Sequence, residues 1–476
     1  MTITRKRFSV SIAASVLFLH LSARAQVFTA LHSLAFTNGT GPVASLLLSG
    51  NTLYGTTRIY GGGTAGGEGS IFRMSIDGSG FTNLHTFSAI APEGGNMNGS
   101  LILSGNTLYT TATFGGGSNY GCVIAMNIDG SGLTNLFNFP ATDSTFPFTN
   151  NVGAYPDVGL ILQGGELYGS ANSGGAYGWG TLFALSTNGA GFINLHNFNF
   201  TNGQYPSADL IFADGALYGT TPGGGTFHNG TIFKINTNGT GYTNFYSFSP
   251  DSGPDFTNGD GAFPSCNLVL SGTNLYGTAG EGGKLGGGTI FAIDTNGTTF
   301  TVLHSFATTN GPAGINAGGA RPKSGLALSG NVLYGTTFTG GSSGSGTLFK
   351  INTDGTGFST LYEFSATNGV GSNGGGTNND GAHPVGGLLY TNGVLYGTAS
   401  DGGVFGLGSI FKISFAPALS IARVGTNAVV TWPSDVVGFN LETTTNLAGT
   451  WDPLAGQYAV TNGISGRQRF YRLKSP

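Results

Sequence analysis

Residues 324–364 read SGLALSGNVLYGTTFTGGSSGSGTLFKINTDGTGFSTLYEF, and this stretch decides the fold because close copies of it recur along the chain. Apolar and polar residues alternate at 347–351, which is typical of a β-strand, and 332–337 reads as a second strand. Asp354-Gly355 predicts a hairpin turn, because this pair tolerates the positive φ that such turns require. With further strands at 324–331 and 358–364, we expect each copy to form four antiparallel strands.

Self-similarity at a period of about 50–60 residues, built from strands, indicates a propeller or a repeat array. The Leu-Tyr pair of the unit occurs seven times, at Leu53-Tyr54, Leu108-Tyr109, Leu167-Tyr168, Leu217-Tyr218, Leu275-Tyr276, Leu333-Tyr334 and Leu395-Tyr396. Seven four-stranded blades close into a ring. We therefore expect an all-β protein with a seven-bladed β-propeller at 26–415.

The order of the strands predicts how the ring closes. The fourth-strand pattern first appears at 28–34, ahead of the first Leu-Tyr pair, whereas the seventh copy stops near Ala416-Pro417 without a fourth strand. We expect the N-terminal strand to complete the last blade, because this pairing covers two strand edges that would otherwise promote aggregation.

The repeated Leu-Tyr-Gly-Thr-Thr, Gly-Gly, Gly-Thr-Ile-Phe-Lys-Ile and Asn-Thr-Asp-Gly-Thr-Gly segments resemble the GloVer (Gloeo/Verruco) tandem repeat of secreted bacterial proteins, over about residues 28–414. The unit is also similar to a kelch blade, but it lacks the tryptophan that is usual on the fourth strand of kelch repeats. The resemblance implies a propeller in an extracellular setting, and it implies no catalytic residues.

The N-terminus predicts a signal peptide at 1–25. Arg5-Lys6-Arg7 is a basic segment, 8–21 is apolar, and Ala23-Arg24-Ala25 is a cleavage site that leaves Gln26 first. We expect a secreted, cell-surface or periplasmic monomer with no transmembrane segment after processing. Its net charge is −8, from 13 basic and 21 acidic residues after the four basic residues of the signal are removed, so we do not expect a nucleic-acid partner.

The composition of the sequence changes after Pro417, where glycine becomes scarce. Short strands are expected at 419–432, 438–445, 451–454 and 469–474. Residues 416–476 thus predict a small C-terminal β-sandwich-like domain that resembles a reduced fibronectin-III fold.

Strand parity places the long, variable loops, those after strands two and four, on one face of the ring, which we call the long-loop face. Variable loops on a rigid scaffold usually carry binding. Exposed aromatic residues beside polar ones suit a glycan or a peptide, although such rings also serve to cover blade junctions. The candidate ligand-binding residues on these loops are Tyr60, Tyr120, Tyr177, Trp179, Phe227, His228 and Asp401.

Histidine and cysteine give little support for catalysis or metal binding. His32, His85, His196 and His304 share one fourth-strand position, which Phe or Tyr fills in the other copies, so the position requires a flat ring. Cys122 and Cys266 lie three blades apart, too far for a disulfide, and we expect both to be buried. The Asp/Asn-Gly turns faintly resemble calcium loops but lack the distal Glu. We predict no cofactor, with calcium left open.

Three functions remain open at this point. The first is a non-enzymatic module that binds a glycan or a protein, and this is the function we favour. The second is an extracellular carbohydrate-active enzyme with acids such as Asp157, Asp260, Glu281 or Asp401, which would need two carboxylates about 5–10 Å apart. The third is a structural component of a wall or matrix. Acids that converge at one end of the channel favour the enzyme, whereas scattered acids favour binding.

Overall fold

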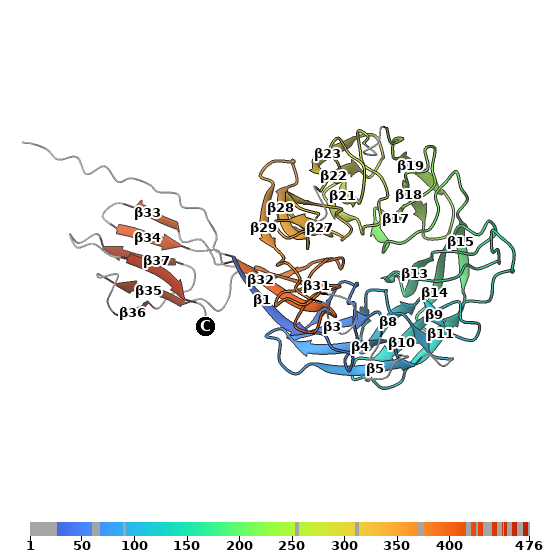
Figure 1. Ribbon diagram of the computed structural model, residues 1–476, viewed down its shortest axis with the longest axis horizontal. Coiled ribbons are helices and arrows are strands. Elements are labelled where there is room, and N and C mark those ends of the chain that lie inside the picture. The colour runs from blue at the N-terminus through green and yellow to red at the C-terminus, as the bar shows by residue number, and fades with distance from the viewer. Residues whose placement is uncertain are drawn as a thin grey trace, which may run out of the picture. The chain divides into compact units, whose positions relative to one another are not determined.

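Each repeat folds into one antiparallel four-stranded sheet, and seven such sheets form a ring (Figure 1). This computed structural model describes residues 26–59, 67–88, 92–252, 257–309, 314–369, 376–415, residue 450 and the C-terminal strands between 420 and 474. No helix occurs in these parts of the chain. The predicted all-β, seven-bladed propeller is therefore confirmed.

The strands follow the repeat closely. Blades one to three consist of β2 (Leu47–Ser49), β3 (Thr52–Thr57), β4 (Gly67–Ser75) and β5 (Thr82–Ser88); β7 (Ile102–Ser104), β8 (Thr107–Ala112), β10 (Cys122–Asn127) and β11 (Thr134–Asn138); and β12 (Ile161–Gln163), β13 (Glu166–Ala171), β14 (Thr181–Ser186) and β15 (Ile193–Asn197). Blades four to six consist of β16 (Ile211–Ala213), β17 (Ala216–Thr221), β18 (Thr231–Asn236) and β19 (Thr243–Ser247); β20 (Val269–Ser271), β21 (Asn274–Ala279), β22 (Gly286–Asp294) and β23 (Phe300–Ala307); and β25 (Ala327–Ser329), β26 (Val332–Thr337), β28 (Thr347–Asn352) and β29 (Ser359–Glu363). Two short pairs lie in the loops, β6 (Gly94–Gly95) with β9 (Phe114–Gly115) and β24 (Asn316–Ala320) with β27 (Thr339–Gly341).

The seventh blade contains β30 (Leu389–Thr391), β31 (Val394–Ala399), β32 (Ser409–Phe415) and, as its fourth strand, β1 (Gln26–Ser33). The blue N-terminal strand runs beside the orange β32 in Figure 1. The predicted closure of the ring by the N-terminal strand is therefore confirmed, and it joins segments from the two ends of the propeller without a covalent link.

The glycine of Leu-Tyr-Gly-Thr has a packing role. Gly219 pairs with Phe233 across β17 and β18, and a Cβ at position 219 would lie 2.5 Å from Cζ of that ring. The same Gly–Phe pairing holds in six blades. In blade two, Thr110 faces Ile124 instead. In blade two, threonine is larger than the usual glycine and isoleucine is smaller than the usual phenylalanine, so the total volume of the pair changes little. Cores tolerate volume-conserving changes of this kind best.

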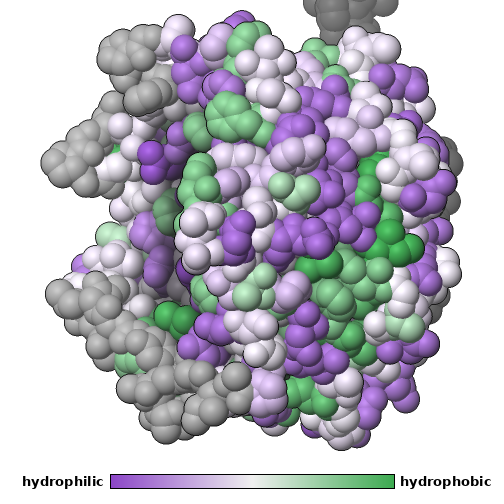
Figure 2. All heavy atoms as spheres, turned by 90° about the vertical axis from the view of Figure 1, so that its right-hand side faces the viewer, coloured by the Kyte–Doolittle hydropathy of each residue, from purple (hydrophilic) through white to green (hydrophobic). Residues whose placement is uncertain are grey.

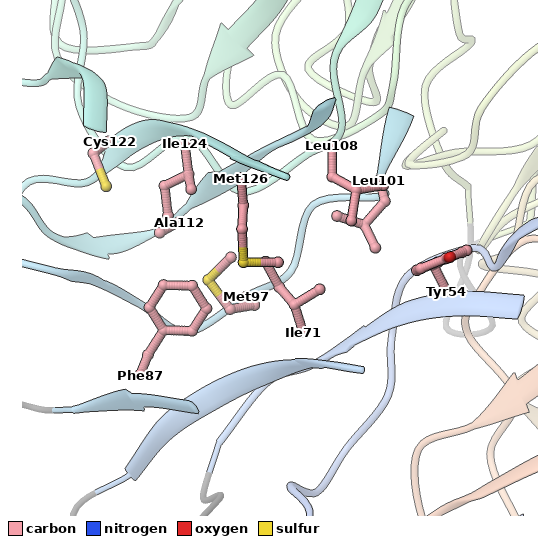
Figure 3. Close-up of a cluster of buried hydrophobic side chains, with 10 residues drawn as sticks. All are labelled: Tyr54, Ile71, Phe87, Met97, Leu101, Leu108, Ala112, Cys122, Ile124 and Met126. Atoms are coloured by element: carbon pink, nitrogen blue, oxygen red, sulfur yellow. The ribbon is translucent and has the colours of Figure 1, made fainter. Parts of the chain in front are cut away.

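The hydrophobic core consists of separate clusters between neighbouring blades. Figure 3 shows the cluster between blades one and two, where Phe87 and Ile71 face Ile124 and Met126. Cys122 belongs to the same cluster, and burial raises the pKa of its thiol to about 12. Both cysteines are free and buried, as expected. Because burying a large apolar side chain contributes about 1.5–3 kcal/mol, each interface adds substantially to the stability of the ring.

At six of the seven blade junctions, the side chain at the shared fourth-strand position stacks on an aromatic ring of the next blade. His196 stacks on Tyr242 of the next blade, with centroids 3.7 Å apart and planes 3° apart. Equivalent stacks join five more pairs of blades, with centroids 3.7–4.1 Å apart: His32–Phe81, Phe137–Phe192, Tyr246–Phe300, His304–Phe358 and Tyr362–Phe28. The structure thus confirms that this position requires a flat ring. At the remaining junction, His85 is followed by Leu133 and lies 3.3 Å from Glu93.

The chain divides into two compact units, and Phe28–Ser414 makes up the propeller. The second unit contains two three-stranded antiparallel sheets, β33 (Ser420–Val424), β34 (Asn427–Thr431) and β37 (Ala459–Gly463), and β36 (Asp452–Leu454), β35 (Asn440–Thr444) and β38 (Phe470–Lys474). The first predicted strand is split by a hairpin between Val424 and Asn427, and β37 was not predicted.

Candidate functional site

Seven equivalent residues stand on the long-loop face, immediately before the chain of each blade enters the centre of the ring. We call them the rim residues: Gly41, Asn96, Tyr155, Tyr205, Phe263, Arg321 and His383. Each has φ between 54° and 58°, and each N–H donates a hydrogen bond to a carbonyl oxygen in the preceding blade. A proline follows in every blade except the second, which has Met97. Left-handed backbone at a non-glycine residue is strained, and such strain gathers at functional sites.

The rim and the loops of blades two to four enclose a cleft of about 430 Å³. Six aromatic residues line it, and together they define the aromatic cleft: Tyr120, Phe146, Phe148, Tyr155, Trp179 and Tyr205. Tyr155 and Tyr205 are rim residues, and Tyr120 and Trp179 lie on glycine-rich loops. Figure 2, seen from the right-hand side of Figure 1, shows hydrophobic residues gathered in patches among hydrophilic ones.

Contacts between rings hold the cleft in shape. The Trp179 ring meets Phe146 and Tyr205 edge to face, with centroids 5.6 and 5.3 Å apart. On the other side, Tyr120 and Tyr155 lie 5.2 Å apart. Burial, together with the nearby Tyr120, raises the pKa of Tyr155, so that this phenol remains a hydrogen-bond donor at neutral pH. Phe146 is 70% exposed, which leaves its ring available to a ligand.

Polar groups lie among the rings. Thr142, Asp143, Ser144 and Ser173 also line the aromatic cleft. The Asp143 carboxylate accepts hydrogen bonds from the backbone N–H and the hydroxyl of Thr149, at 2.7 and 2.6 Å, which fixes the inserted loop that carries Phe146 and Phe148. The cleft therefore combines flat apolar walls with a few oriented hydrogen-bonding groups, as small-molecule sites do.

The seven predicted ligand-binding residues do not form one site. Tyr120 and Trp179 line the aromatic cleft, whereas Tyr177 is 51% exposed and lies outside the lining. Phe227 is exposed on the next glycine-rich loop, and His228 contacts Phe200, which in turn contacts Trp179. Tyr60 falls outside the described residues.

Asp401 lies on the opposite side of the ring, in a second cleft of about 540 Å³ around Gly41. Its Oδ2 is 3.0 Å from Nδ1 of His383. Burial alone would raise the pKa of Asp401, but hydrogen bonds from His383 and Ser400 and the charge of His383 hold it below its usual value. Arg58 and Phe338 also line this cleft, so its character is charged rather than aromatic.

The four acids proposed for an enzyme do not converge at one end of the channel, because Asp157 lines the channel whereas Asp401 lines a separate cleft. Asp260 is buried and accepts hydrogen bonds from the Tyr246 hydroxyl and from Ser249, which is a structural role. Glu281 lies 4.0 Å from Arg321, and Asp401 pairs with His383. Asp157 lines the central channel together with Asp209, an acid that the sequence analysis did not select. Burial and the nearby Asp209 raise the pKa of Asp157 to about 7. Asp260 and Glu281 both lie close to Asp251, whose pKa is raised by burial and, to a smaller extent, by their charges.

The carboxylates of the hairpin turns close their own turns. Asp354 Oδ1 accepts hydrogen bonds from the backbone N–H and the hydroxyl of Thr356, at 2.9 and 2.7 Å. Asp77 and Asp129 do the same with Ser79 and Ser131. These hydrogen bonds lower the pKa of each carboxyl and occupy its Oδ1 atom.

The sequence interpretation missed Tyr155, Tyr205, Phe146 and Phe148. A signal for the first two was present, because the residue before proline recurs once in nearly every repeat and varies widely in identity. No comparable signal marks Phe146 and Phe148, which belong to the insertion at 140–157, because the insertions at 249–265 and 365–385 differ from it in sequence.

Comparison with protein families agrees with the repeat. The Gloeobacter/Verrucomicrobia repeat matches residues 15–152, 143–255 and 254–375. No curated protein matches the chain. Similar solved structures include an oligogalacturonate lyase from Vibrio parahaemolyticus, with 9% identity, 81% of this chain and 93% of that chain covered, and a TM-score of 0.48. A chain of a nidogen/laminin complex has 12% identity, coverage of 63% and 91%, and a TM-score of 0.38, and TolB from Acinetobacter baumannii has 12%, coverage of 63% and 62%, and 0.36.

A search of the described residues for membrane-spanning helices finds none that is long and apolar enough.

Proposed function

The chain belongs to the Gloeobacter/Verrucomicrobia repeat family, and we propose that it is a non-enzymatic binding module that holds a glycan in the aromatic cleft. The observation that carries this proposal is the set of six aromatic side chains around a space of about 430 Å³, with hydroxyl and carboxylate groups among them. Three of the four candidate acids already have partners in the chain, Asp260 with Tyr246, Glu281 with Arg321 and Asp401 with His383, and this favours binding over hydrolysis.

The chemistry of the cleft fits a sugar chain better than a wholly apolar ligand. A pyranose ring has apolar C–H groups on its faces and hydroxyls around its edge, so it pairs with an aromatic face beside hydrogen-bonding groups. The Trp179 and Phe146 rings provide two aromatic faces, with their planes at 79° and their centroids 5.6 Å apart. Asp143, Ser144 and Ser173 lie at the same surface for the hydroxyls. Rings that are already held by their neighbours lose little entropy on binding.

The test is a glycan array with the purified full chain, followed by titration of the best ligand with variants. We expect Trp179→Ala and Phe146→Ala each to weaken binding about tenfold or more, which corresponds to about 1.4 kcal/mol. Phe405→Ala is the matched control, because Phe405 is a 49% exposed aromatic residue on the equivalent loop of blade seven and does not line the cleft. Equal weakening by all three variants, or no glycan binding by folded protein, would refute the proposal.

The location that we propose is outside the cytoplasm, at the cell surface or in the medium. It is supported by the basic, apolar and Ala-x-Ala segments of residues 1–25, which lie outside the described residues. Mass spectrometry of exported protein should find Gln26 as the first residue, and retention of unprocessed protein in the cytoplasm would contradict this.

A further inference from the structure

The central channel, beneath the rim, has two tiers of side chains. The residue two positions after each rim residue forms the upper tier, and the residue four positions after it forms the lower tier. The channel encloses about 210 Å³. Along one arc of the upper tier, neighbouring blades contribute Asn98, Asp157, Ser207 and Ser265, so that oxygen atoms dominate this wall.

The lower tier is closed by its own hydrogen bonds. Asp209 accepts from the backbone N–H of Gly159 at 2.5 Å and from Nδ2 of Asn267 at 2.8 Å. Its own N–H donates to Oδ1 of Asn267 at 2.8 Å, and the Ser100 hydroxyl bonds to the same carboxylate. Four blades are thus tied together at this level, and Asp209 is held in one orientation.

The upper tier contrasts with this arrangement, because two of its acceptors have no partner. Oδ1 of Asp157 and Oδ1 of Asn98 are both buried, and neither receives a hydrogen bond. The two residues stand at the same level on adjacent blades and line the same channel. A buried acceptor without a donor costs about 1–3 kcal/mol, and a buried carboxylate costs more.

No described Lys, Arg or His forms an ion pair with Asp157 or Asp209. Lys323 is the cation of the upper tier, but its Nζ lies 4.6 Å from the centre of the Phe338 ring. Within the described part of the chain, these carboxyl groups therefore have no cationic partner at ion-pair distance.

We propose that the channel binds one divalent cation through oxygen ligands, with Ca²⁺ as the fitting ion, the Asp157 carboxylate supplying the charge and the Asn98 amide oxygen a second ligand. Ca²⁺ takes carboxylate, amide and water oxygens in flexible geometry. Ser207, beside Asp157 at the same level, is placed to add a hydroxyl, and the Asp209 carboxyl lies in the tier below. Among the described residues no group of three or more His, Cys, Asp or Glu exists, so the remaining ligands are amide, hydroxyl and water oxygens.

The experiment is calorimetric titration of the EDTA-treated full chain with Ca²⁺, Mg²⁺ and Mn²⁺, together with thermal unfolding in each ion. We expect one Ca²⁺ per chain, with a Kd on the order of 0.1–1 mM as in extracellular modules, and a rise in Tm. Asp157→Asn should weaken binding at least tenfold and abolish the rise in Tm.

Two further variants separate ligation from damage to the fold. Asn98→Val introduces the residue that blades one and seven carry at this level, as Val43 and Val385, so it should fold while binding Ca²⁺ several-fold more weakly. Asp354→Asn removes one exposed carboxylate from a hairpin turn, where blade four already has Asn238, and should bind like the unaltered chain. The proposal is overturned if no ion binds to folded protein, if Asp157→Asn and Asn98→Val both bind as tightly as the unaltered chain, or if a high-resolution structure in Ca²⁺ shows an ordered water only.

Discussion

Replacing His304 with phenylalanine should make the propeller more resistant to acid. The imidazole is sandwiched in β23, stacked on Phe358 at 3.7 Å and edge to face with Phe306 at 4.7 Å. Burial lowers its pKa from 6.5 to about 4. A histidine with a lowered pKa in the folded state stabilises the fold fully above its unfolded pKa of 6.5, and this contribution is lost as the pH falls towards 4.

The pKa values set the size of the effect. A fully enclosed ring would lose about 3 kcal/mol between pH 7.5 and pH 4, and access of solvent to the edge of the ring reduces this to about 2 kcal/mol. Phenylalanine fits the site, because Phe137 occupies it in blade two and stacks on Phe192 at 3.9 Å. His304→Phe should therefore match the unaltered chain within about 1 kcal/mol at pH 7.5 and exceed it by about 1 kcal/mol at pH 5.

Urea denaturation at pH 7.5, 6, 5 and 4 provides the measurement, since the free energy of unfolding can be extrapolated at each pH. His85→Phe is the control, because the partner position on the next blade is Leu133 and the His85 imidazole lies 3.3 Å from Glu93. We expect this control to show no gain at low pH. A difference between His304→Phe and the unaltered chain that stays constant from pH 7.5 to 4 would refute the reasoning.

Two other predictions concern closure and packing of the ring. Phe28→Ala and Phe300→Ala each remove a stacked ring, with centroids 4.1 and 4.0 Å from their partners, and each should lower the free energy of unfolding by about 2–3 kcal/mol. Hydrogen exchange should increase at β1 and β32 only for Phe28→Ala, because these two strands are paired without a covalent link. Equal patterns of exchange in the two variants would argue against this explanation. Gly219→Thr should lower the free energy of unfolding by about 2 kcal/mol, since its Cβ would lie 2.5 Å from the Phe233 ring. Adding Phe233→Ile should restore about half of this loss, because blade two pairs Thr110 with Ile124 at the same place. If chemical denaturation shows that the losses of the two single variants simply add in the double variant, this reasoning is contradicted.

The ring was predictable because its rules are local and repeated. The Leu-Tyr-Gly strand, the Asp-Gly turn and the displaced fourth-strand pattern at 28–34 each appear in the sequence, and closure followed from counting strands. The flat-ring requirement at His304 and its equivalents was equally accessible, since Phe and Tyr replace histidine there. The hairpin that splits 419–432 and the strand β37 were missed because a segment without repeats offers no second copy for comparison.

The candidate site was predictable only in part, because it depends on which loops of different blades meet. Trp179 and Tyr120 were identified from their loops, but their partners come from the rim and from one insertion. Asp260 looked like a surface acid in the sequence, yet it is buried beneath Tyr246 and Ser249. Distances between loops that are distant in sequence are set by the whole ring, and composition or spacing carries no record of them.

At the rim residues, the backbone conformation is the same in every blade, whereas the side chain differs between blades. Every blade uses the same left-handed backbone and the same hydrogen bond to the preceding blade at this position. Glycine, as at Gly41, adopts that backbone without strain, and asparagine, as at Asn96, tolerates it. The other five blades carry Tyr155, Tyr205, Phe263, Arg321 and His383, at a cost of order 1 kcal/mol each. These large side chains contact groups of the preceding blade, as Tyr155 does with Tyr120, Tyr205 with Trp179 and Arg321 with Glu281, and these contacts offset part of the strain.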